Sequence, residues 1–245
     1  MADIVDRAMW ATWYDLPEDG RKEYIDWLHE VYIPRELQRP GILWAAHYEN
    51  DVSEKRSLRS HRELTHTTDP SVPAGYAYLL LFGASLPMVF LNPSPHERRS
   101  VWSEEERKYF GRQIEVRSSI LMEHARVEGP DIAKRGPGLT PGPVIQVGSF
   151  NINAWENEEE LVVWFARHRM PRMVRSPGCI GTRNLISICG WAKHVVIYEF
   201  VSLETIEKTV VKEDWEISHR VVANLVHAPN SSCRGVRIWP PVKDS

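Results

Sequence analysis

Apolar residues are spaced along this chain in two different patterns. Short apolar runs bounded by glycine, proline or charge predict strands, and longer segments with apolar residues three or four positions apart predict amphipathic helices. In the first half we expect strands at residues 9–14, 42–48, 76–82 and 120–127, and helices at 20–38 and 103–117. In the second half we expect strands at 144–152, 180–189, 195–200 and 235–239, and helices at 157–175 and 212–226.

The two halves also share residues at a constant offset. An offset of 137 positions relates three landmarks to their counterparts: Trp27 to Trp164, Pro34 to Pro171, and the Pro-Gly pair at 40–41 to that at 177–178. The same offset pairs Trp13 with Phe150. After the second strand it falls to 117, because the first half carries a longer loop at 51–73. Such self-similarity indicates a duplicated structural unit.

Each half therefore has the order β-α-β-β-α-β, which is the ferredoxin-like unit. One such unit leaves one face of its sheet bare, and two units can cover these faces against each other. The sequence predicts an α+β fold in which two fused ferredoxin-like repeats form an intramolecular α+β barrel. We expect the first repeat at residues 1–130, a Gly/Pro-rich linker at 131–143 and the second repeat at 144–245.

Composition narrows the class of protein. Apolar residues make up 42% of the 245-residue chain and aromatic residues 10%, which is enough to build a core. The net charge of −3 gives no reason to expect nucleic acid as a partner. No apolar run approaches the ~20 residues of a membrane span, and the first residues do not read as a signal peptide. Three cysteines without a CxxC pattern fit a reducing compartment, so we expect a cytoplasmic protein.

The repeated residues resemble the dimeric α+β-barrel superfamily, which includes EthD-like proteins, antibiotic-biosynthesis-type monooxygenases and muconolactone-isomerase-like enzymes. In many members a helix reads W-x4-H-x-P, and a Pro-Gly turn leads from it into a strand. Here the position two before the proline is Tyr32 in the first half and Arg169 in the second. The resemblance implies a pocket for a small, flat, hydrophobic ligand between each sheet and its helices. It also implies cofactor-free oxygenation, isomerase, lyase or cyclase chemistry, or haem binding as in chlorite dismutases and aldoxime dehydratases.

The first half is the richer in aromatic and titratable side chains. Its expected pocket is lined by Trp10 or Trp13, Trp27, Tyr32, Trp44 and His47. His47 is the candidate general acid/base, because imidazole titrates near neutral pH, and a core histidine is the structural alternative. Tyr32 is the candidate donor to a substrate oxygen, and a tyrosine at a helix end is its alternative. Tyr14, on the same face of its strand as Trp10, completes the candidate substrate-binding aromatics.

The second half differs at the equivalent positions. Arg183 and Asn184 stand where the first half has Ala46 and His47, and Arg169 stands where it has Tyr32. Arg169 and Arg183 could bind an anionic group, or this half could be a structural copy. Glu199 would act as a buried base if it pointed inward and as a solvated charge if it pointed outward.

Histidines outside the pocket suggest weaker sites. His61 and His66 in the long loop could bind a metal with nearby acids, but their spacing matches no metal motif, so we expect no metal site. A haem ligand would be a histidine facing an apolar cleft, and His124, His219 and His227 are the candidates.

Three functions follow from these observations. The first is a cofactor-independent enzyme that acts on a small aromatic or polyketide-like compound by acid/base chemistry or oxygenation, with no cofactor and no membrane partner. The second is a non-catalytic or stress-associated protein that binds such a compound. The third is a haem-dependent enzyme. A homodimer is a further expectation for any of them.

Overall fold

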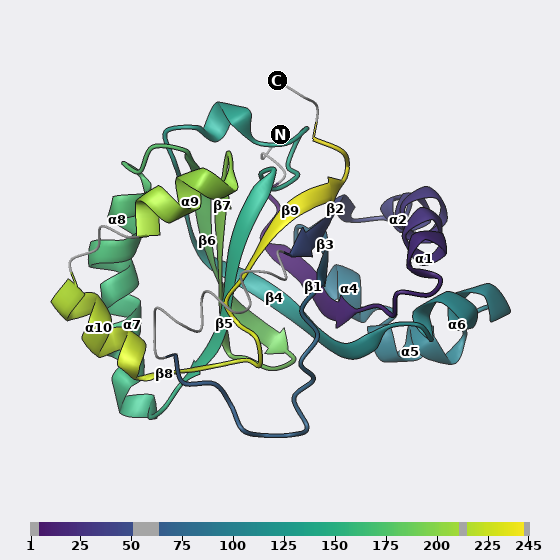
Figure 1. The fold of residues 1–245 in the computed structure, drawn as a ribbon, viewed down its shortest axis with the longest axis horizontal. Coiled ribbons are helices and arrows are strands. Elements are labelled where there is room, and N and C mark those ends of the chain that lie inside the picture. Colours follow the sequence, from purple (N-terminus) through teal and green to yellow (C-terminus); the bar gives the residue numbers. More distant parts are fainter. Residues whose placement is uncertain (1–4, 51–63, 211–214, 243–245) are drawn as a thin grey trace.

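The computed structural model describes residues 5–50, 64–210 and 215–242. Two four-stranded sheets, one from each half of the chain, join edge to edge and form a closed antiparallel barrel (Figure 1). The helices of the first half cover one side of this barrel and those of the second half cover the opposite side. The predicted fold class is thereby confirmed.

The first half supplies four strands and two groups of helices. Its strands are β1 (Ala8–Asp15), β2 (Ile42–Asn50), β3 (Tyr78–Ala84) and β4 (Ile114–Glu128), paired in the order β4-β1-β3-β2. Between β1 and β2 lie α1 (Arg21–Trp27), a π-helical turn (Leu28–Tyr32) and α2 (Ile33–Leu37). Between β3 and β4 lie α4 (Met88–Leu91), α5 (Pro95–Ser100) and α6 (Glu104–Phe110).

The second half has the same order of strands and helices. Its strands are β5 (Val144–Ile152), β6 (Cys179–Cys189), β7 (His194–Phe200) and β9 (Cys233–Trp239), paired as β6-β7-β5-β9, and the short β8 (Leu225–His227) adds to β5. Its helices are α7 (Glu158–Trp164), a π-helical turn (Phe165–Arg169), α8 (Met170–Met173), α9 (Leu203–Val210) and α10 (Trp215–Ala223). Short 3-10 turns occupy Ile132–Lys134 and Trp155–Asn157. Within the described ranges, no helix has the length and apolar character needed to cross a membrane.

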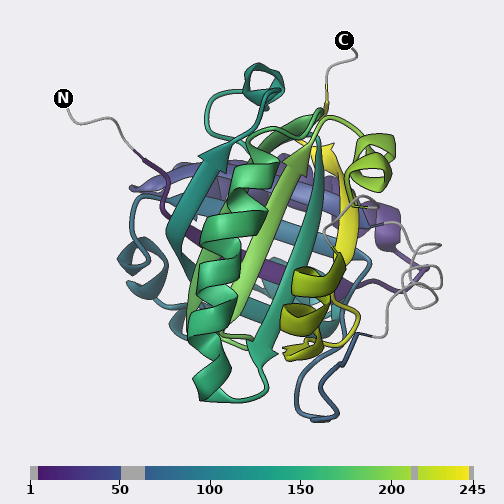
Figure 2. The same ribbon diagram turned by 90° about the vertical axis from the view of Figure 1, so that its left-hand side faces the viewer.

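Two antiparallel seams close the barrel. β2 pairs with β9 at one seam, and β4 pairs with β6 at the other. Figure 2 shows the strands of the second half crossing in front of those of the first, with the long α7–α8 segment laid over them. Because every strand of the ring has two neighbours, neither sheet keeps an open edge at the seams.

The interruption in the long helix of each half has a local cause. A proline at helix position i provides no N–H for the carbonyl of residue i−4, and its ring clashes with the preceding turn. Just before Pro34, the N–H of Ile33 bonds to the carbonyl of Leu28, five residues back. The N–H of Met170, just before Pro171, bonds in the same way. Each wide turn admits the proline without ending the helix, and its last residue is Tyr32 in the first half and Arg169 in the second.

The core has three layers. The barrel interior is filled from both halves by large side chains that include Trp13, Trp44, Tyr48 and Tyr76. A second layer lies between the first sheet and α1–α2, and a third lies between the second sheet and α7–α8. Each fully buried large apolar side chain stabilises the fold by roughly 1.5–3 kcal/mol.

Several element predictions need correction. The helix predicted over 103–117 ends at Phe110, and β4 begins at Ile114, so Arg117 is a strand residue that faces the barrel interior. The helix predicted over 212–226 is α10, which gives way to β8, and residues 211–214 lie outside the described structure. The match of Trp13 with Phe150 is one residue out of register, because Trp13 points into the barrel and Phe150 points outward. The repeat and linker boundaries stay a prediction.

Candidate functional site

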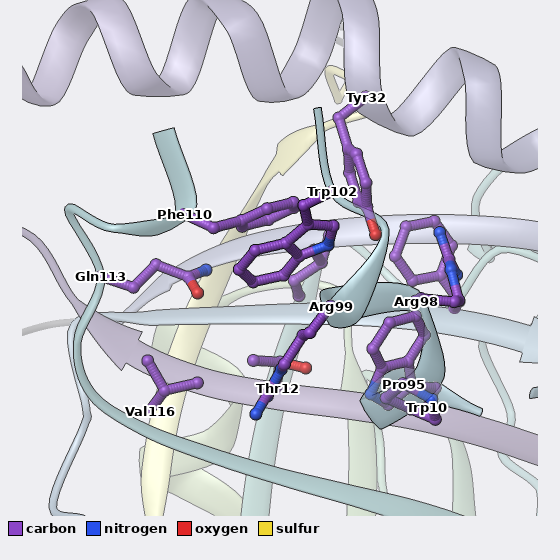
Figure 3. Close-up of a pocket in the computed structure, with 12 residues that line it drawn as sticks. Trp10, Thr12, Tyr32, Pro95, Arg98, Arg99, Trp102, Phe110, Gln113 and Val116 are labelled. Carbon is purple, nitrogen blue, oxygen red and sulfur yellow. The ribbon is translucent and has the colours of Figure 1, made fainter. Parts of the chain in front are cut away.

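A cleft lies between the outer face of the first-half sheet and the segments that cover it (Figure 3). It contains about 500 Å³ of empty space, part of which is open to solvent. The strands contribute Trp10, Thr12, Leu80, Phe82 and Val116, and the covering segments contribute Tyr32, Pro95, Arg98, Arg99, Trp102, Phe110 and Gln113. This is where the resemblance implies a pocket in the first half.

Aromatic rings form most of the walls. Trp10 lies 5.8 Å from Phe82 between ring centres, and Trp102 stacks on Phe110 at 4.8 Å. The indole N–H of Trp10 donates to Ser118 at 2.7 Å, so its polar atom already has a partner. Flat apolar walls of this kind favour a flat, apolar or aromatic ligand.

One end of the cleft is polar. The hydroxyl of Tyr32 points from the helix into the cleft, close to Arg98 (Figure 3). Burial raises the pKa of Tyr32 far above its ordinary value, so the hydroxyl stays protonated and can donate. Burial opposes the charge of Arg98, but the neighbouring Tyr32 and Glu36 outweigh it and raise the pKa of Arg98.

Arg98 is held by a shared carboxylate. Glu36 is 3% exposed and accepts hydrogen bonds from both Arg98 and Arg39, the second at 2.9 Å. The two guanidinium groups and one carboxylate carry a net charge of +1. The Nη1 atom of Arg98 is buried and has no hydrogen-bond partner within the described part of the chain. A buried N–H without a partner is costly, which makes this atom a candidate contact for a ligand oxygen.

His47 lies outside the cleft lining, beneath the helix. Its ring is fully buried, with Nε2 2.8 Å from the hydroxyl of Tyr14 and Nδ1 2.8 Å from Nε2 of His29. Burial lowers the pKa of His47 well below its usual value and that of His29 to about 4, so both rings are neutral at pH 7. The acid/base role of His47 stays a prediction, and any proton that it exchanged would pass through Tyr14 or His29.

A second tyrosine extends this buried polar group toward the cleft. The rings of Tyr14 and Tyr24 meet edge to face, with centres 5.8 Å apart. The Tyr24 hydroxyl accepts a hydrogen bond at 2.8 Å from the amide of Gln113, which lines the cleft. Tyr14 therefore lies behind the wall of the cleft and contacts a ligand only through other residues.

Two of the expected pocket tryptophans lie elsewhere. Trp44 faces the barrel interior and donates its indole N–H to Asp6 at 2.7 Å, so it is on the opposite side of the sheet from the cleft. Trp27 is buried against α6, with its ring 4.5 Å from that of Tyr109. Among the expected pocket aromatics, Trp10 and Tyr32 line the cleft. Strand alternation assigned the faces, but Trp44 and His47 occupy opposite faces of one strand and cannot both border one pocket.

The proposed anion site at Arg183 is wrong for an electrostatic reason. Arg183 is fully buried inside the barrel and is ion-paired with Asp6 at 2.8 Å and with Glu123 at 2.5 Å. The arginine neighbours hold the pKa of Asp6 below its usual value, despite burial. Two carboxylates already neutralise the Arg183 guanidinium, so it has no charge to offer a substrate.

Arg169 and Glu199 both contact neighbouring side chains. The Nε of Arg169 donates to the hydroxyl of Tyr198 at 3.0 Å, and its guanidinium carbon lies 4.6 Å from the centre of that ring. Glu199 points into the barrel, is 1% exposed and pairs with Arg135 at 3.0 Å. Substrate binding by Arg169 stays a prediction.

The histidines proposed for haem do not fit the role of an axial ligand in an apolar cleft. His124 and His219 are exposed. His227 is buried on β8, where its ring packs between His66 and Phe150 and its pKa is lowered to about 4 by burial. His61 lies outside the described residues, and across the described ranges no three metal-ligating side chains gather at one point.

The covering segment supplies the residues that sequence reasoning missed. Arg98, Arg99 and Trp102 come from α5 and the turn after it, which were not predicted as part of the pocket. The signal was present in Ser94 and Glu97, which form a capping box at the start of α5, as Ser103 and Glu106 do for α6.

Comparison with known proteins places this fold among solved structures. No protein-family model matches the chain, and no curated protein matches its sequence. A protein named as a monooxygenase from Fusobacterium nucleatum is similar in structure, with a TM-score of 0.58, 8% identity and coverage of 95% of this chain and 92% of the other. An anthrone oxidase-like protein has a TM-score of 0.58, 10% identity and coverage of 97% and 92%. A protein named as a chlorite dismutase has a TM-score of 0.55, 12% identity and coverage of 96% of each chain. At such identities the likeness establishes the fold and leaves the chemistry open.

Proposed function

We propose that this protein is an enzyme that binds a small aromatic or polyketide-like compound in the first-half cleft and activates it by enolate or phenolate chemistry, ending in oxygenation or isomerisation. The observation that carries the proposal is the cleft itself, in which aromatic walls meet a polar end formed by Tyr32 and Arg98. The names of two structural neighbours, a monooxygenase and an anthrone oxidase-like protein, favour the oxygenation branch.

The chemistry requires a negative oxygen to be stabilised as the substrate loses a proton. A protonated tyrosine and a permanent cation at one end of an aromatic cleft stabilise such an oxygen in a partly water-excluded site. In the oxygenation branch, a ring CH₂ next to the enolate system reacts with O₂ and gives a carbonyl and water. In the isomerisation branch, a solvent water in the open part of the cleft takes the proton from one carbon and returns it to another.

Substrate turnover by matched tyrosine variants tests this proposal. The protein would be screened against anthrone-like and hydroxylated aromatic compounds, with oxygen uptake and product formation measured in parallel. Tyr32→Phe should lower kcat about 100-fold or more, because it removes the donor to the developing oxyanion. Tyr109→Phe is the control, since the Tyr109 hydroxyl bonds to Glu23 on the outside of the helices.

Two results would contradict the proposal. Equal turnover by Tyr32→Phe and the unmodified protein would remove Tyr32 from the chemistry. Binding of these compounds without turnover would indicate the non-catalytic binding protein that the sequence left open.

A further inference from the structure

We infer that the cleft takes its aromatic ligand as an oxyanion, a phenolate, enolate or carboxylate, whose charge is bound by Arg98. This inference rests on the proposed function and adds the ionisation state of the ligand and the residue that recognises it. The capping box of Ser94 and Glu97 marks the helix that carries Arg98, but it does not indicate a ligand.

The charged residues that line the cleft are cationic. Among the described residues, its lining contains two arginines, Arg98 and Arg99, and no aspartate, glutamate or histidine. The nearest carboxylate to Arg98, that of Glu36, is shared with Arg39 and so neutralises only one of two cations. A neutral ligand would leave the remaining charge unmatched, whereas a ligand with one negative oxygen would match it.

Arg98 lies where the polar end of the cleft meets its aromatic wall. Its guanidinium carbon lies 5.6 Å from the centre of the Trp10 ring, so the charge borders the aromatic wall. Glu36 accepts from the Nη2 atom of the guanidinium, and Nη1 lies buried without a partner among the residues that the structure describes. An oxygen attached to a ring against Trp10 could accept from Nη1 and from the hydroxyl of Tyr32. These charge-assisted hydrogen bonds are the stronger kind.

An anionic substrate would also explain how the cleft could work without a base. The described lining has no carboxylate or imidazole to act as a base, and His47 lies behind the wall. A substrate that binds as its phenolate or enolate needs no base in the cleft, because solvent has taken up the hydroxyl proton before or during binding. Arg98 would then act by lowering the pKa of the bound hydroxyl compound.

The experiment uses one pair of probes and one indicator compound on the full-length protein. The affinity of 1-naphthoate is compared with that of its neutral analogue 1-naphthamide by calorimetry. The ionisation of bound 4-nitrophenol is followed by the absorbance of its yellow phenolate across a pH series. We expect the carboxylate to bind about tenfold more tightly or better than the amide. We also expect the pKa of bound nitrophenol to fall by roughly 1 or more.

Variants assign the effect to one residue. Arg98→Met should abolish both preferences, while Arg107→Met, at an exposed arginine on α6 outside the cleft lining, should keep both. Arg98→Lys retains the charge and serves if Arg98→Met does not fold. It should keep the nitrophenol shift but weaken naphthoate, because lysine lacks the planar fork.

The possible results distinguish a failure of this inference from a failure of the proposed function. Equal binding of naphthoate and naphthamide, with nitrophenol unshifted, overturns the inference and leaves an aromatic-binding cleft. Preferences that survive in Arg98→Met overturn it as well. Failure of all three probes to bind overturns both the inference and the proposed function.

Discussion

The buried histidine pair makes the stability of this protein depend on pH in a defined window. His47 and His29 have folded-state pKa values below that of an exposed histidine, because burial disfavours the charged ring. In the unfolded chain each takes up a proton near pH 6.5. The contribution of the two neutral rings to the free energy of unfolding is therefore complete above about pH 6.5, and it is lost as the pH falls below that value.

His47→Asn isolates the contribution of one ring. Asparagine occupies the equivalent position in the second half, where Asn184 is 3% exposed, so a side chain of this size is accommodated at such a site. The variant loses the hydrogen bonds to Tyr14 and His29, which should cost about 1–3 kcal/mol for each group left unpaired. It also removes one proton from the difference between unfolded and folded chains. Between pH 6 and 5, the slope of unfolding free energy against pH should fall by about 1.4 kcal/mol per pH unit.

Urea unfolding at several pH values between 7.5 and 5 measures both effects. Ile33→Val is the control, since Ile33 is fully buried in the same core layer and carries no titratable group. It should lower stability by about 0.5–1.5 kcal/mol equally at every pH. A slope for His47→Asn that equals the slope of the unmodified protein would refute the reasoning, because it would mean that His47 is already protonated in the fold.

Two further substitutions test the barrel interior. Trp44→Phe should lower the free energy of unfolding, measured in urea, by about 1–3 kcal/mol, because Asp6 loses one hydrogen-bond donor. The affinity for an aromatic ligand should stay unchanged. A loss of affinity would place Trp44 in the cleft. Arg117→Met should leave stability unchanged or raise it by about 1 kcal/mol. Arg117 is 4% exposed, burial lowers its pKa to about 10, and no carboxylate pairs with it in the described ranges; a loss above about 2 kcal/mol would contradict this.

The sequence by itself determined the architecture. The W, P and PG landmarks at one offset predicted two β-α-β-β-α-β units, and alternation along the strands correctly put Trp10 and Tyr14 on one face and separated Trp44 from His47. These features are local. Successive residues of a strand point to opposite faces, and a proline disturbs the helix that contains it, whatever the strand or helix packs against.

Only the tertiary structure decided which side chains meet. Arg183 reads as a free cation in sequence, and it is neutralised by Asp6, 177 positions away. Arg98 lies in a segment without a strong periodic signal, and it reaches the cleft because α5 folds back over the sheet next to Tyr32. Charge pairing and pocket lining depend on contacts between distant parts of the chain, and periodicity within a segment carries no information about them.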